Sequence, residues 1–69
     1  MKQYCYKTES GLFVQAYEDD MEVWYSPKFN ANTFITDLAT LKHWVQDVHN
    51  VDTTYWQIFE INMTFNRVE

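Results

Sequence analysis

Apolar and polar residues alternate most regularly toward the end of the chain, over Thr54–Asn66. One set of alternate positions is largely apolar, and the other turns polar from Glu60 onward. The apolar set includes Phe59, Ile61, Met63 and Phe65. A period of two residues is typical of a strand with one covered face. The pattern predicts a strand here, either at the centre of a sheet or at an edge beside the first strand.

Three shorter alternating runs lie near the start of the chain, at Gln3–Thr8, Leu12–Tyr17 and Met21–Tyr25. Gly11 is the only glycine and adopts positive φ without steric cost, so it predicts a tight hairpin turn between the first two runs. The acidic residues 18–20 favour a second turn. Because Pro27 has no backbone N–H, we expect the antiparallel meander to end there.

A helical spacing follows the meander. Steps of three, four and three residues connect Leu38, Leu41, Val45 and Val48. Such steps are typical of an amphipathic helix, and Thr36 is a suitable N-cap. The spacing predicts a helix over Thr36–His49. Residues 28–35 have no clean pattern, and we expect a loop with a short extended piece at Thr33–Ile35.

These elements predict a single α+β domain over residues 1–69, ordered strand–strand–strand–helix–strand. One amphipathic helix would pack on one face of an antiparallel sheet of three to four strands. The expected core is Val14, Val23, Leu38, Leu41, Val45, Val48, Phe59, Ile61 and Met63. A 69-residue chain buries only about 60% of its unfolded surface, so its stability is marginal. Cys5 is the only cysteine, which leaves aromatic packing or oligomerisation as sources of extra stability.

Ten acidic residues against five basic ones give a net charge of −5. This charge disfavours nucleic acid and anionic membranes as partners, because both bind through Lys and Arg. It permits a protein partner with a basic surface. The N-terminal residues lack the apolar region of a signal peptide, and a lone cysteine favours a reducing compartment. We therefore expect a cytoplasmic protein with no membrane segment.

Few residues suggest catalysis. His43 and Asp47 are four residues apart on the predicted helix and can meet, either as a base with its orienting carboxylate or as a simple surface pair. His43 and His49 would lie about 240° apart around a helix and could not share one metal ion. Cys5 is expected to be a small buried residue rather than a reactive thiol. The sequence predicts no enzyme, no metal and no cofactor, although a site using His43 or Cys5 remains an alternative.

The expected binding residues lie around the acidic turn. They are Tyr17, Glu18, Asp19, Asp20, Glu22 and Trp24. Aromatic residues fall on both faces of the predicted sheet, and one helix can cover only one face. An exposed apolar patch marks a binding site, so we expect these aromatics and carboxylates to contact a partner. The alternative is that the acidic residues only solvate a hairpin tip.

The chain resembles small acidic accessory proteins encoded by tailed bacteriophages. The points of resemblance are the start Met1-Lys2-Gln3-Tyr4, the many Trp and Tyr residues, the single glycine, and a helix such as Asp37–Val45. The resemblance implies a non-enzymatic protein that binds and inhibits a host factor, such as a defence system. A small structural or assembly protein that associates with itself, as a homodimer for example, is the alternative.

Overall fold

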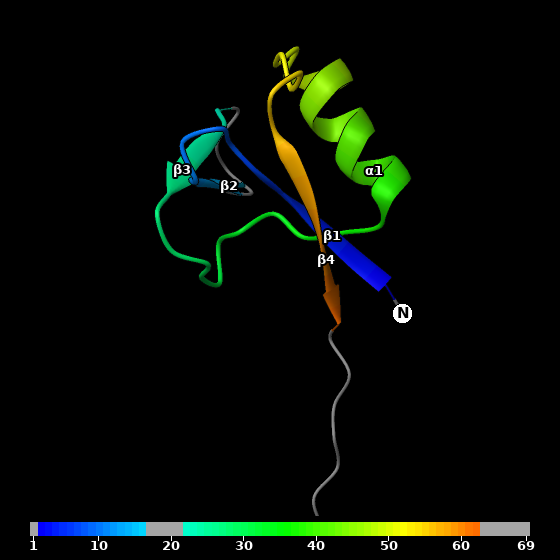
Figure 1. The fold of residues 1–69 in the computed structure, drawn as a ribbon. Coiled ribbons are helices and arrows are strands. Elements are labelled where there is room, and N and C mark those ends of the chain that lie inside the picture. The colour runs from blue at the N-terminus through cyan, green and yellow to red at the C-terminus, as the bar shows by residue number, and fades with distance from the viewer. Residues whose placement is uncertain (1, 17–21, 63–69) are drawn as a thin grey trace, which may run out of the picture.

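A computed structural model describes residues 2–16 and 22–62 and shows an α+β fold (Figure 1). Four strands form an antiparallel sheet in the order β3-β2-β1-β4. They are β1 (Lys2–Lys7), β2 (Phe13–Gln15), β3 (Trp24–Ser26) and β4 (Gln57–Asn62). The α-helix α1 (Leu38–Lys42) continues into the π-helix η1 (His43–Val48). The predicted fold class is confirmed, and β4 takes the edge position beside β1.

The predicted glycine turn joins β1 to β2. Gly11 has φ +89°, a conformation that other residues rarely adopt. The Gly11 N–H donates to the Thr8 carbonyl at 2.9 Å, and the Thr8 N–H donates to the Leu12 carbonyl at 2.8 Å. The Leu12 N–H donates in turn to Thr8 Oγ1 at 3.0 Å. The turn places Lys7 directly opposite Phe13.

The stretch before the helix lies between the first two strands. Thr33 bridges to Gln15 of β2, and Thr36 bridges to Tyr4 of β1. The Phe34 N–H donates to the Val14 carbonyl at 2.9 Å, whereas the Tyr4 N–H donates to the Thr36 carbonyl at 2.7 Å. The predicted extended piece is therefore present, and it satisfies backbone groups of both strands.

The helical segment differs from the predicted one at both its start and its backbone geometry. Asp37, not Thr36, is the N-cap, and its carboxylate accepts from the Thr40 N–H at 3.0 Å. The Thr36 backbone is already committed to pairing with Tyr4, so it cannot begin the helix. After Lys42 the helix widens to π geometry, and the His49 N–H donates to the Trp44 carbonyl at 3.1 Å. Asn50, with φ +53°, then ends the segment.

The core lies between the helical segment and one face of the sheet. Its buried members are Tyr6, Val14, Leu41 and Val45. Six partly buried residues pack around them: Tyr4, Val23, Phe34, Trp44, Val51 and Trp56. The predictions for Val14, Leu41 and Val45 are confirmed. Ile61 is half-buried, and Met63 lies outside the described residues.

Three of the predicted core residues are exposed instead. Leu38 is 37% exposed, Val48 53% and Phe59 40%. Leu38 is the first residue of α1, at the end of the segment farthest from Val45 in sequence. A π-helix forms its hydrogen bonds one residue farther along the chain than an α-helix, so each residue advances by a smaller angle. Val48 is consequently rotated away from the line through Leu41 and Val45.

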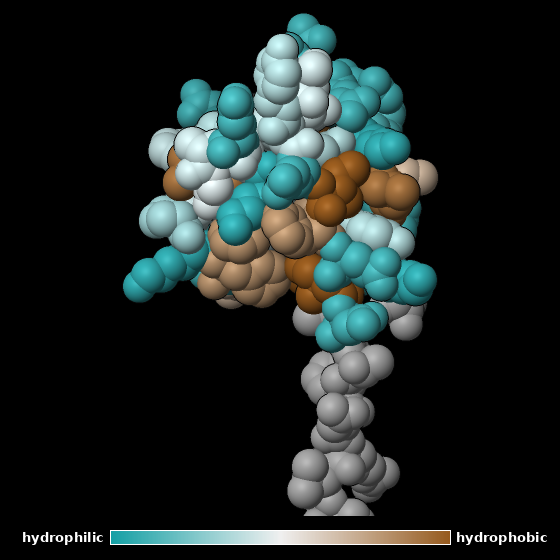
Figure 2. All heavy atoms as spheres, in the orientation of Figure 1, coloured by the Kyte–Doolittle hydropathy of each residue, from teal (hydrophilic) through white to brown (hydrophobic). Residues whose placement is uncertain are grey.

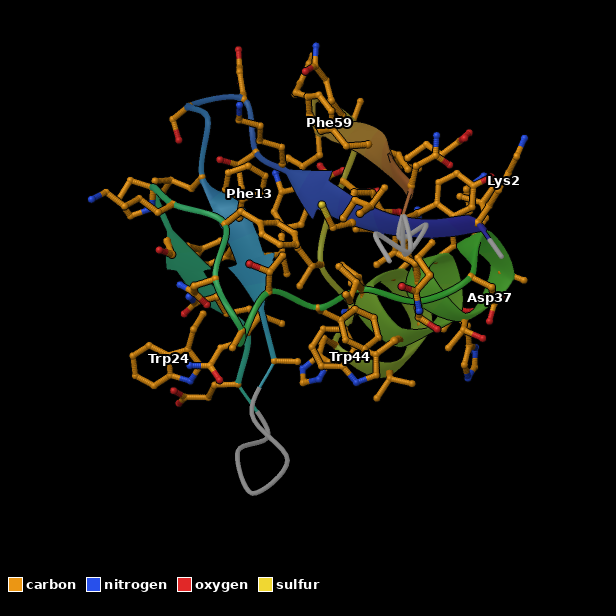
Figure 3. All side chains as sticks on the ribbon, turned by 90° about the horizontal axis from the view of Figure 1, so that it is seen from below. Lys2, Phe13, Trp24, Asp37, Trp44 and Phe59 are labelled. Carbon is orange, nitrogen blue, oxygen red and sulfur yellow. The ribbon has the colours of Figure 1, made fainter. Side chains whose placement is uncertain are left out.

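The exposure of Phe59 follows from the pairing of β4 with β1. Phe59 lies opposite Cys5, and Ile58 lies opposite Tyr6. Directly opposed residues share a face, and successive residues point to opposite faces. Phe59 and Ile61 therefore lie on the sheet face away from Tyr6 and the helix, as Figure 3 shows for Phe59. The most regular apolar stripe of the sequence is thus a strand, as predicted, but its apolar face points away from the helix, and the prediction of Phe59 as a core residue is wrong.

Tyr6 is the largest fully buried side chain, with 1% exposure. Its ring meets Trp56 edge to face at 5.5 Å between ring centroids. Its hydroxyl accepts from Gln46 Nε2 at 2.9 Å, and the same nitrogen donates to Thr53 Oγ1 at 2.9 Å. Tyr6 therefore ties the first strand to the helical segment and to the connection before β4.

Candidate protein-binding surface

Two of the six binding residues predicted from the sequence lie within the described structure. Glu22 is exposed, and Trp24, on the edge strand β3, is 44% exposed. Trp24 is paired in register with Gln15 and lies apart from Phe13 and Phe59 in Figure 3. The other four lie outside the described residues: Tyr17, Glu18, Asp19 and Asp20.

The predicted contact between His43 and Asp47 is present. His43 Nδ1 lies 3.0 Å from Asp47 Oδ2, and the two side chains are 68% and 69% exposed. Both groups remain in water, which weakens the orienting effect of the carboxylate on the ring. The ring of His49 lies against Trp44, with 4.2 Å between centroids. The two histidines therefore have separate surroundings.

Cys5 is fully buried in β1, as the sequence predicts. Burial raises the pKa of its thiol, and the charge of Lys7 only partly opposes that effect. A raised pKa keeps the sulfur as a thiol, which is a poor nucleophile. Within residues 2–16 and 22–62, no three His, Cys, Asp or Glu side chains converge as a metal site would require.

Among the described residues, Lys7 contacts two phenyl rings on the helix-free face of the sheet. Lys7 Nζ is 5.1 Å from the centroid of the Phe13 ring and 5.3 Å from that of Phe59. Phe29 meets Phe13 edge to face, with 5.7 Å between centroids. We call Lys7, Phe13, Phe29 and Phe59 the phenyl–lysine patch. Figure 2 looks onto this face and shows apolar side chains grouped near its centre, with hydrophilic ones around them.

Each member of the patch is held by a local feature. The glycine turn sets Lys7 opposite Phe13, and the β1–β4 register places Phe59 opposite Cys5, two residues from Lys7. Phe29 belongs to the turn after β3, where Ser26 Oγ accepts from the Lys28 N–H at 3.2 Å. That turn is closed by Asn30, whose N–H donates to Thr33 Oγ1 at 3.0 Å.

The patch carries positive charge in an acidic chain. Lys7 has contacts with two aromatic rings, and no carboxylate lies within ion-pair distance of it in the described part of the chain. Lys2, by contrast, lies 3.9 Å from Glu60 at the surface. Phe29 is 48% exposed and Phe59 40%. The patch therefore offers apolar area together with the positive charge of a half-buried lysine.

Part of this surface can be predicted from the sequence. Lys7 and Cys5 share one face of the first strand, and Phe59 shares one face of the last strand with Ile61. What alternation does not reveal is which face the helix covers. The contacts of Lys7 with Phe13 and Phe59 depend on the strand register, which alternation does not reveal.

Comparison of the chain with protein-family models, with curated proteins and with solved structures finds no match. Among the described residues, no helix has the length and apolar character needed to cross a membrane.

Proposed function

We propose that the chain is a non-enzymatic protein-binding module and that the phenyl–lysine patch is its contact surface. The observation that supports this most directly is the cluster of partly exposed phenyl rings around Lys7 on the helix-free face. Exposed apolar patches with a polar surround are typical of interaction sites. A partner segment that presents apolar side chains and a carboxylate would match both features of the patch.

The placement of the reactive groups supports binding over catalysis. His43 and Asp47 lie in water on the helical segment, whereas Cys5 is buried within the sheet. A catalytic site needs nucleophile, base and oxyanion donors within hydrogen-bond reach of one another. The resemblance to phage accessory proteins supports a bacterial host protein as the partner, inhibited in the host cytoplasm.

A pull-down from bacterial lysate with matched variants tests this proposal. Phe29→Asp replaces an exposed ring of the patch with a carboxylate that would repel a carboxylate on the partner. Tyr55→Asp makes the equivalent change at a ring that is 72% exposed and outside the patch. We expect the wild type and Tyr55→Asp to retain a stoichiometric partner, and Phe29→Asp to lose about 90% of it, the loss that removal of one interface anchor produces. Equal recovery by both variants, or no stoichiometric partner for the wild type, would contradict the proposal.

A further inference from the structure

The two edges of the sheet are built differently. β3 has three residues and is followed directly by Pro27 and Lys28. Short strands, proline and lysine are the devices that prevent an edge from pairing with another chain. β4 has six residues, with neither proline nor lysine among them. Only one of the two edges is therefore protected by its sequence.

Within residues 2–16 and 22–62, the outer side of β4 has no strand partner. All six of its residues pair with β1, and no other described strand pairs with it. An edge strand presents a row of backbone N–H and C=O groups that can accept a further strand. Ile58 is 38% exposed on one face of β4 and Phe59 is 40% exposed on the other. A strand added at this edge would cover apolar area on both faces.

We propose that β4 pairs antiparallel with β4 of a second copy of this chain, around a two-fold axis that passes beside Phe59. A two-fold axis perpendicular to the sheet keeps the helix-free faces of both copies on the same side. Opposed residues must then come from the same face, which restricts the possible registers. The register centred on Phe59 pairs Phe59 with its own copy, Ile58 with Glu60, and Gln57 with Ile61.

Charge selects this register over its neighbours. A register centred on Glu60 would place two like carboxylates directly opposite each other, which destabilises a strand pair. A register centred on Ile58 would shorten the overlap, because β4 begins at Gln57. In the register centred on Phe59, Glu60 lies opposite an aliphatic side chain and keeps its contact with Lys2 of its own copy, 3.9 Å away.

The charges along β1 and β4 favour a second copy over an unrelated strand at this edge. The β1–β4 strand pair contains Lys2, Lys7 and Glu60 as its charged side chains, so two copies meet here without the repulsion expected from a net charge of −5. Pairing would form a continuous sheet of eight strands and bring the two phenyl–lysine patches side by side.

The expected affinity of this dimer is low. A contact confined to one strand buries less surface area than the interfaces of stable dimers do, so we expect a dissociation constant in the micromolar range or weaker. The inference does not depend on the proposed host partner.

Molecular mass measured by analytical ultracentrifugation over a range of concentrations tests the dimer. Phe59→Lys places two ammonium groups opposite each other at the axis, whereas Phe29→Lys makes the same change on the patch but away from β4. We expect the wild type and Phe29→Lys to reach the dimer mass as concentration rises, and Phe59→Lys to remain monomeric. A monomeric wild type at every concentration, even one that captures a strand of another protein, would overturn the proposal. So would equal dimerisation of the two variants.

Disulfide cross-linking tests the register without changing Phe59. Single cysteines are introduced into a Cys5→Ala background, at Gln57 in one protein and at Ile61 in another. Directly opposed residues in a strand pair are close enough for a disulfide, whereas diagonal neighbours are about 7–8 Å apart. We expect a mixture of Gln57→Cys and Ile61→Cys to oxidise to a mixed dimer faster than a mixture of Ile58→Cys and Asn62→Cys. The reverse order of rates would place the axis at Glu60 and overturn the proposed register.

Discussion

Tyr6 shows most clearly how one side chain can connect the parts of this domain. It fills the space between the sheet and the helical segment, and its hydroxyl reaches Gln46, forty positions later in the sequence. A buried tyrosine needs a partner for its hydroxyl, and here Gln46 supplies it. Gln46 itself is exposed and also donates to Thr53, so one amide group joins three segments.

Tyr6→Phe removes the hydroxyl while keeping the ring in place. We expect the free energy of unfolding, measured by urea denaturation, to fall by about 0.5–1.5 kcal/mol, the usual net contribution of one hydrogen bond. Tyr55→Phe is the matched control, because Tyr55 is 72% exposed, and its unfolding curve should overlay that of the wild type. If Tyr6→Phe is as stable as the control, the hydrogen bond to Gln46 does not contribute to folding.

For single residues, the sequence predicts burial correctly where the flanking members of the apolar stripe are buried too. It does not predict burial where either face of a strand could be the covered one. Leu41 and Val45 lie in the middle of the helical stripe and are buried as expected. Tyr6 was missed because both alternating sets of the first strand contain apolar residues. Phe59 was misplaced for the related reason that periodicity identifies a strand but not the face that meets the helix.

At the scale of elements, the structure keeps the predicted order and changes how the helix is built. The hydrophobic stripe located the helical segment to within one or two residues, but it did not indicate the switch to π geometry after Lys42. Trp44, within the π-helix, stacks on Phe34 with 4.3 Å between ring centroids, and it also lies against His49. These contacts depend on the loop that carries Phe34, which has no regular pattern in the sequence. The helical periodicity of the sequence does not predict tertiary contacts of this kind.

The start of the helix makes a pH-dependent contribution. The hydrogen bonds from Thr40 lower the pKa of Asp37 below its ordinary value of 3.8. A carboxyl group with a lowered folded-state pKa stabilises the fold above its unfolded-state pKa, and that contribution is lost as pH falls through the folded-state value. Asp37→Asn keeps an oxygen that can accept from the Thr40 N–H but removes the charge.

We therefore expect Asp37→Asn to unfold at a lower temperature than the wild type at neutral pH, with the difference closing as the pH drops below 3.8. Thermal unfolding followed by circular dichroism at several pH values measures this difference. Asp37→Ala, which removes the acceptor as well as the charge, should remain less stable than the wild type at every pH. A difference between wild type and Asp37→Asn that is constant across the pH range would show that the charge of Asp37 is not responsible.

At the scale of the whole molecule, the charge is unevenly arranged. The chain has a net charge of −5, yet the phenyl–lysine patch has Lys7 at its centre. The fold class and the order of the elements along the chain followed from the sequence because turn residues and periodicity act locally, but the edge position of β4 came only from the structure. The patch did not follow from the sequence either, because it joins residues from β1, β2, β4 and the turn after β3. We propose that the acidic residues predicted to form a turn, of which only Glu22 lies among the described residues, contact the same partner as this patch.

The predicted acidic turn is expected to affect how fast the captured partner binds. Exposed charges are screened beyond about 8 Å at physiological ionic strength, so steering by the turn should weaken as salt increases. We expect the double variant Asp19→Asn, Asp20→Asn to associate about tenfold more slowly at low salt with little change in dissociation, because peripheral charges act mainly on the encounter. Trp24→Ala should instead accelerate dissociation, since an aromatic anchor acts after contact is made. Surface plasmon resonance at several salt concentrations separates the two rates. If the double variant associates at the wild-type rate at every salt concentration, the acidic residues only solvate their turn and the phenyl–lysine patch alone remains as the proposed contact.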